Sequence, residues 1–97
     1  MKAVFIVFNQ ANTERVEFLL DYVGVRGFTW WESVQGRGTE TGEPRRGTHT
    51  WPEMNSALLT VVPDDRVDAI LEGIRKIDHI NTEVGVKAFV WNIENGY

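Results

Sequence analysis

Residues 61–77 read VVPDDRVDAILEGIRKI, and this stretch contains the transition that decides the fold. It starts at the end of an apolar run, ALLTVV at positions 57–62, which is typical of a buried strand. Pro63, Asp64 and Asp65 form a helix-start signal, an aspartate cap with a further acid in the first turn. The sequence therefore predicts a strand that leads directly into an amphipathic helix. The apolar stripe of that helix is Val67, Ile70, Leu71, Ile74 and Ile77.

The same alternation of strand and helix extends in both directions from this stretch. Downstream, residues 86–93 (VKAFVWNI) indicate a last strand. Upstream, KAVFIVFN at Lys2–Asn9 and FTWWESV at 28–34 indicate two more strands. Between those two, a helix follows from the spacing of Val16, Leu19, Leu20 and Val23, with Asn12 or Thr13 as its cap and Gly24 at its end.

The order of elements is β-α-β-β-α-β, which predicts one α+β domain over residues 1–97 with a ferredoxin-like fold. In this fold two helices cover one face of a four-stranded antiparallel sheet. The other face should be polar in a monomer, yet Ala3, Phe5 and Val7 alternate with an equally apolar set in the first strand. One explanation is that these are ordinary core residues on strands whose register differs slightly from the expected one. We expect instead that neighbouring subunits cover the second face.

Composition narrows the classes of function. The chain has 97 residues, 42% hydrophobic and 25% charged, and this profile excludes a disordered tail. A net charge of -4 argues against a general nucleic-acid binder, and Arg26-Gly27-Phe28 starts an RNA-binding aromatic motif that Thr29–Ser33 does not continue. The chain has no cysteine and no apolar stretch long enough to cross a bilayer, so we expect a cytoplasmic protein without membrane insertion.

Residues 36–52 differ from the rest because they are rich in glycine, proline and threonine, which predicts a long, mobile loop. Within this loop two guanidinium groups, an imidazole and an indole occur close together. Such a group suits recognition of an anion or of an acidic patch on a partner protein, with a solvated loop as the alternative. The four residues are Arg45, Arg46, His49 and Trp51.

Four segments together resemble the PII family of trimeric signalling proteins, which sense adenine nucleotides. Three of them are GVRGFT at 24–29, ESVQGRG at 32–38 and VVPDD at 61–65. The fourth runs from Asp65 to the KAFV that starts at Lys87, and its spacing agrees with the family without a gap. The resemblance implies a homotrimer with its sheets facing inward and a nucleotide cleft between neighbouring subunits. It also implies a loop that contacts a protein partner, with a membrane transporter or efflux system as the expected kind.

The resemblance further implies which residues line the cleft. Glycines in a loop expose backbone N–H groups that can hold a phosphate, and basic side chains beside them add charge. No cofactor is required, and an adenine nucleotide is the expected ligand. The implied binding residues are Gly27, Phe28, Thr29, Gln35, Gly36, Arg37, Gly38 and Lys87.

Two other functions are alternatives to nucleotide sensing. A CutA-like trimer would bind a divalent cation through His49 and carboxylates such as Glu53, although no ligand spacing indicates a metal site. An enzyme is not expected, because no nucleophile, base and orienting acid share a spacing, and the only serines are Ser33 and Ser56. The strand tryptophans Trp30, Trp31 and Trp91 are expected to pack in the core or at a subunit interface.

Overall fold

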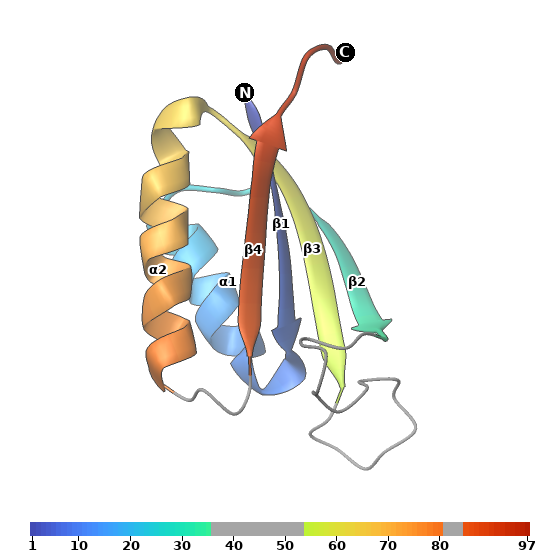
Figure 1. Cartoon of the computed structure of the whole chain (residues 1–97), viewed down its shortest axis with the longest axis vertical. Helices are drawn as coiled ribbons and strands as arrows, with labels where there is room; N and C mark the ends of the chain where they lie inside the picture. The colour runs from blue at the N-terminus through green and yellow to red at the C-terminus, as the bar shows by residue number, and fades with distance from the viewer. Residues whose placement is uncertain (36–53, 81–84) are drawn as a thin grey trace.

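The computed structural model describes residues 1–35, 54–80 and 85–97, and it confirms the predicted α+β fold (Figure 1). One four-stranded sheet has the order β2-β3-β1-β4, and all its neighbouring pairs are antiparallel. Both helices lie on one face of the sheet (Figure 1). The elements are β1 (Lys2–Asn9), α1 (Thr13–Tyr22), β2 (Thr29–Val34), β3 (Asn55–Val62), α2 (Val67–Ile80) and β4 (Val86–Asn92), with short 3-10 turns at Gln10–Asn12 and Asp64–Arg66.

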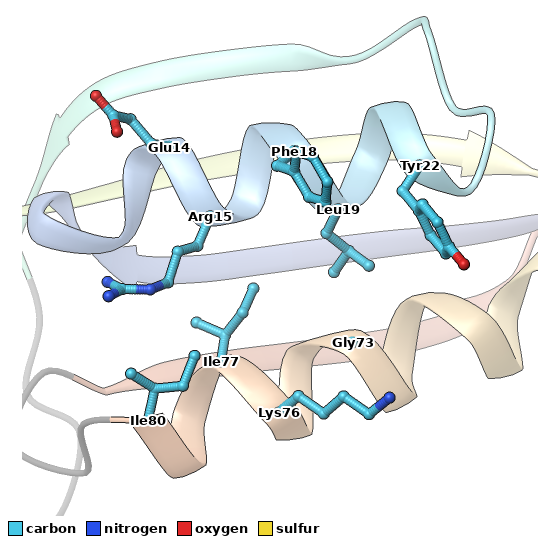
Figure 2. Close-up of a pocket in the computed structure, with 9 residues that line it drawn as sticks. All are labelled: Glu14, Arg15, Phe18, Leu19, Tyr22, Gly73, Lys76, Ile77 and Ile80. Atoms are coloured by element: carbon cyan, nitrogen blue, oxygen red, sulfur yellow. The ribbon is translucent and has the colours of Figure 1, made fainter.

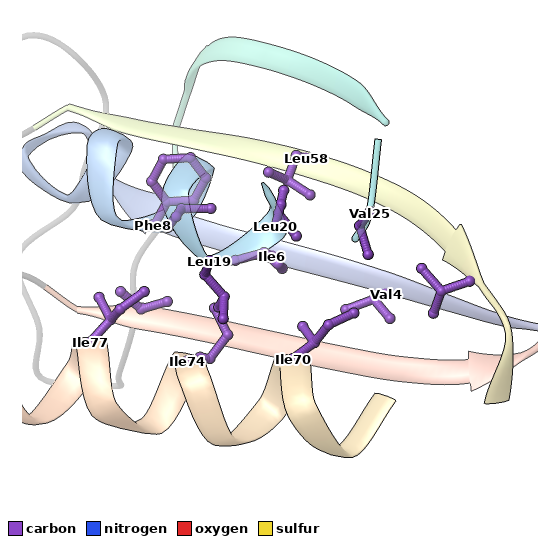
Figure 3. Close-up of a cluster of buried hydrophobic side chains, with 13 residues drawn as sticks. Val4, Ile6, Phe8, Leu19, Leu20, Val25, Leu58, Ile70, Ile74 and Ile77 are labelled. Atoms are coloured by element: carbon purple, nitrogen blue, oxygen red, sulfur yellow. The ribbon is translucent and has the colours of Figure 1, made fainter. Parts of the chain in front are cut away.

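The core lies between the sheet and the two helices (Figure 3). Alternate residues of a strand point to opposite faces, and in β1 the side chains that face the helices are Val4, Ile6 and Phe8, all at most 1% exposed. Each such side chain contributes about 1.5–3 kcal/mol through burial. The helices meet them with Val16, Leu19 and Leu20 from α1 and with Ile70, Ile74 and Ile77 from α2.

Helix α1 ends just before Gly24, as the sequence predicted. Gly24 has φ +80°, a left-handed conformation that glycine adopts without steric cost. The Val25 amide donates to the Leu20 carbonyl at 2.8 Å, and the Gly24 amide donates to the Asp21 carbonyl at 3.1 Å. This pair of bonds is a Schellman motif. Because Val25 and Leu20 are both buried, the chain leaves the helix already packed against the core.

The predicted helix starts needed correction. Pro63, not Asp64, is the N-cap residue of the turn before α2, and no side chain caps that turn. Asp64 instead forms an ion pair at 2.9 Å with the Met1 ammonium, which lies nearby because β1 and β3 are paired. Asn12 does precede α1, but its side chain makes no capping bond to the helix. The carboxylates of Asp64 and Asp65 therefore interact favourably with the dipole of the helix but do not cap it.

Strand bounds differ slightly from the prediction. β3 starts two residues earlier, at Asn55, and β2 starts one residue later, at Thr29. β4 ends at Asn92 rather than Ile93, whose amide still donates to the Met1 carbonyl at 3.3 Å. These shifts lie at strand ends, where pairing with the neighbouring strand decides the boundary.

Candidate functional site

The face of the sheet away from the helices is open and apolar within the described residues. In β1 this face carries Ala3, Phe5 and Val7, which alternate with the core residues. Residues paired across antiparallel strands share a face, so Phe89 and Leu59, both opposite Phe5, lie on it too. Its most exposed large side chains are Phe89 (55%), Trp91 (49%), Val61 (46%) and Trp31 (43%).

Aromatic contact joins this face across the sheet. The rings of Phe5 on β1 and Trp31 on β2 meet edge to face with centroids 6.3 Å apart, although β3 lies between their strands. The apolar surface therefore extends from β2 to β4, whereas the sequence predicted it for the first and last strands. Trp30 points the other way: it is half-buried against the core, where its ring meets Phe8 at 5.4 Å.

A small pocket opens at one end of the sheet, between the turn after α1 and the turn before α2. Its volume is about 240 Å³. The Gly27 carbonyl accepts a 2.6 Å hydrogen bond from the Thr60 hydroxyl, which ties the first turn to β3. The pocket is lined by residues 24–27 from the first turn and by Val61, Val62, Pro63 and Arg66 from the second.

Two guanidinium groups give this pocket a positive character. Arg26 is exposed and belongs to the lining. Arg66 donates to the Val23 carbonyl at the end of α1, and its Nε lies 3.9 Å from the Asp65 carboxylate. Close by, the hydrogen bond from the Met1 ammonium lowers the pKa of Asp64. The pocket can therefore hold an anionic group against guanidinium donors.

The structure places Gly27, Phe28 and Thr29 at this same end of the sheet. Gly27 lines the pocket, and Thr29 starts β2. Phe28 is 42% exposed, and its ring lies 6.0 Å from that of Trp30, tilted by 50°. These three predicted site residues are consecutive in the chain and lie at one corner of the sheet.

Gln35 lies at the other end of β2 and is exposed. Just before it, the pairing of β2 with β3 shifts register between Trp31 and Val34. The freed Glu32 carbonyl accepts hydrogen bonds from the Ser56 hydroxyl and from the Gln10 side chain, each at 2.6 Å. The register shift therefore leaves the Glu32 carbonyl to two side-chain donors.

Lys87 lies far from Thr29 within one subunit. It is exposed near the start of β4, opposite Val7, whereas Thr29 is opposite Leu59 on the other edge strand. Three strand spacings, about 14 Å, and two residues, about 7 Å, separate them. Both side chains nevertheless face the open side, because their pairing partners alternate with the core residues. One subunit alone does not bring them together.

Several predicted residues lie outside the described ranges. These are Gly36, Arg37 and Gly38 of the implied cleft, the partner-loop residues Arg45, Arg46, His49 and Trp51, and Glu53 of the alternative metal site. Within the described ranges, no group of three metal-ligating side chains occurs, and no helix is long and apolar enough to span a membrane.

The prediction missed Arg66 and Pro63, and it used Arg26 only as part of a motif. Arg66 follows the two aspartates of the helix start, where charge is ordinarily explained by solvation of the first turn. The positive φ of Gly24 and the bond from Arg66 to Val23 bring this side chain to the pocket. Such a contact joins residues 43 positions apart, so local spacing does not reveal it.

Comparison with known proteins extends these observations. The family model for nitrogen regulatory protein P-II matches residues 1–97. No curated protein matches the chain. Similar solved structures include CPII, a nitrogen regulatory PII-like protein from Thiomonas intermedia K12 bound to ADP, AMP and bicarbonate, with 26% identity, a TM-score of 0.76 and coverage of 98% of this chain and 93% of that chain.

Two further structures show the same similarity. CPII bound to ADP, AMP and acetate is 24% identical, with a TM-score of 0.75 and coverage of 99% of this chain and 88% of that one. A candidate PII-like signalling protein from Thermus thermophilus is 24% identical, with a TM-score of 0.68 and coverage of 95% and 85%. At this identity, both show likeness of fold.

Proposed function

Because the chain belongs to the nitrogen regulatory protein P-II family, as its sequence motifs suggested, we propose that it is a regulator that binds an adenine nucleotide between subunits of a homotrimer. In the proposed trimer the open sheet faces of three chains pack together. When the nucleotide binds, the regulator signals to a protein partner in the cytoplasm. The expected partner is a membrane transporter or efflux system. The role of this chain is regulatory rather than enzymatic.

One observation carries this proposal: the expected contact residues occupy separate corners of the subunit. Gly27 and Thr29 lie at one edge of the sheet and Lys87 at the other, but Thr29 and Lys87 face the same open side. A ligand that touches both corners therefore needs residues from two chains. Packing of the apolar faces would bring one subunit's β2 edge toward its neighbour's β4 edge and so form such a cleft.

The ligand class follows from charge and from the similar structure. The pocket beside Gly27 has the guanidinium groups of Arg26 and Arg66, and Lys87 is a further cation on the open face. Among the described residues, no carboxylate lies within ion-pair distance of Lys87 or Arg26. These cations suit the phosphates of a nucleotide, and the 26% identical CPII binds ADP and AMP.

Calorimetric titration with ADP and AMP tests the proposal. A charge-assisted hydrogen bond contributes about 1.5–3 kcal/mol, so Lys87→Ala and Arg26→Ala should each weaken binding about tenfold or more. Lys76→Ala, which removes an exposed lysine from the helix layer, is the matched control and should leave nucleotide affinity unchanged.

Two results would contradict this proposal. Unchanged affinity in both site variants would refute the cleft chemistry, even in a trimer. Binding of a divalent cation without any nucleotide binding would refute the nucleotide function and favour the CutA-like alternative at His49 and Glu53. Light scattering on the same samples determines whether each variant still assembles.

A further inference from the structure

A hollow lies between α1 and α2, on the side of the helix layer that faces away from the sheet (Figure 2). This helix groove has a volume of about 480 Å³. Leu19 from α1 and Ile77 from α2 form its apolar floor, and Phe18, Tyr22 and Ile80 stand at its margins (Figure 2). None of the residues predicted for the nucleotide site belongs to it.

Gly73 explains how Leu19 comes to form the floor of the groove. A Cβ atom added at this position would lie 2.2 Å from Cδ1 of Leu19, so only glycine leaves room for that side chain. Leu19 therefore packs against the backbone of α2 and is 8% exposed. Leu19 occupies the space that a side chain at position 73 would need, and it forms the apolar floor of the groove there.

The margins of the groove are unusually apolar for a free surface. Phe18 is 71% exposed, Tyr22 80% and Ile80 60%. The rings of Phe18 and Tyr22, one helical turn apart, are stacked with centroids 6.3 Å apart. The proposed trimer packs through the opposite face of the sheet, so assembly would leave this surface accessible to a ligand.

Positive charge lies over this apolar floor. Figure 2 shows the Arg15 side chain extending from α1 toward Ile77 and Ile80, whereas the Glu14 carboxylate points away from the groove. Arg15 contacts the neutral Asn12 Oδ1 at 3.4 Å. Lys76 stands along α2, and no described carboxylate is within ion-pair distance of either cation. This local excess of cations occurs in a chain whose net charge is -4.

We propose that the helix groove binds an amphipathic monocarboxylate, an acyl chain of medium length that ends in a carboxylate. The chain lies over Leu19, Gly73 and Ile77, and the carboxylate pairs with the Arg15 guanidinium. Arginine suits this role because its planar fork bonds a carboxylate through two parallel N–H groups. Lys76 adds a second positive charge along the path.

The dimensions favour a small ligand over a partner helix. Arg15 and Tyr22 are seven residues apart, which is about 10.5 Å of helix axis. The volume of the groove falls in the range of about 300–1,000 Å³ that small-molecule sites occupy. A stable protein interface buries about 800 Å² on each partner, more than two helical turns of apolar surface offer.

Titration of the whole chain with decanoate, below its micellar concentration, tests this proposal by amide NMR. We expect the amides of Phe18 and Gly73 to shift, and 1-decanol, which has the same chain without the charge, to bind about tenfold more weakly. Arg15→Ala should weaken decanoate about tenfold and leave decanol unchanged. Arg75→Ala is the matched control, because Arg75 is an exposed arginine of α2 that pairs with Glu72 and does not line the groove.

Three results would overturn the proposal. Equal affinity for decanoate and decanol, or no effect of Arg15→Ala, would remove the role of the carboxylate. Decanoate shifts at Phe89 and Trp91 instead of the helix layer would place the ligand on the sheet face. Shifts caused by an acidic amphipathic peptide where decanoate causes none would assign the groove to a protein partner. Nucleotide titration of Arg15→Ala gives a separate readout, since the proposed nucleotide cleft does not use this residue.

Discussion

Replacing Phe89 by aspartate should dissociate the proposed trimer without unfolding its subunits. Phe89 lies on β4, on the open apolar face, and 55% of its surface is exposed in the single subunit. Because the side chain already contacts solvent there, Phe89→Asp adds no buried charge to an isolated chain. In the trimer, the same carboxylate would lie within an apolar interface, where an unpaired charge is strongly unfavourable.

The size of the effect follows from the exposed area. A phenylalanine has roughly 200 Å² of surface, so the exposed part of Phe89 is about 110 Å², and its burial contributes about 3 kcal/mol per subunit at about 25 cal/mol per Å². Three subunits together lose roughly 8 kcal/mol of association free energy if the interface buries each ring fully. Desolvation of the carboxylates increases this loss, so dissociation at micromolar concentration is expected.

Size-exclusion chromatography with light scattering measures the outcome. The unmodified chain should have the mass of a trimer and Phe89→Asp that of a single chain, with far-ultraviolet circular dichroism that still shows a folded protein. Phe18→Asp is the matched control, since Phe18 is 71% exposed but lies on the helix layer. A monomeric wild-type chain would refute the reasoning, as would a Phe89→Asp variant that keeps the mass of a trimer.

Three further predictions concern stability and can be checked by urea denaturation. Ile70→Ala should lower the free energy of unfolding by about 2–5 kcal/mol, because Ile70 is fully buried in the core and its loss leaves a cavity. Gly24→Ala should cost about 1–3 kcal/mol, since φ is +80° and the new Cβ would lie 2.6 Å from Nη1 of Arg66, whereas Gly27→Ala, with no atom within 4 Å, should be nearly neutral. Thr60→Val should cost about 1 kcal/mol by removing the 2.6 Å bond to the Gly27 carbonyl, and a neutral result would show that this bond does not hold the turn.

The fold could be predicted from the sequence because its signals are local. Apolar residues at helical spacing from Val67 to Ile77 predict α2 without reference to any other part of the chain, and Gly24 predicts the end of α1. The two apolar faces of β1 were equally visible as a simple alternation. The order of these elements then restricts the topology to very few arrangements.

The helix start before α2 shows where local signals were insufficient. Two aspartates after a proline are typical of capping, but Asp64 binds the Met1 ammonium because strand pairing brings the first residue beside it. A carboxylate responds to the nearest charge in space, whatever its position in the chain. Sequence spacing does not contain that information.

The sequence likewise accounts for one part of the candidate site, and the tertiary structure for the other. The sequence by itself determined which residues are expected to contact a ligand, since Gly27, Thr29 and Lys87 lie in short motifs that resemble those of the family. Only the tertiary structure decided that Thr29 and Lys87 lie on opposite edges of one sheet yet face the same side, and that Arg66 lies beside Gly24. Distances across a sheet depend on strand order and register, which join residues far apart in the chain through backbone hydrogen bonds, and such long-range pairing exists only once the chain has folded.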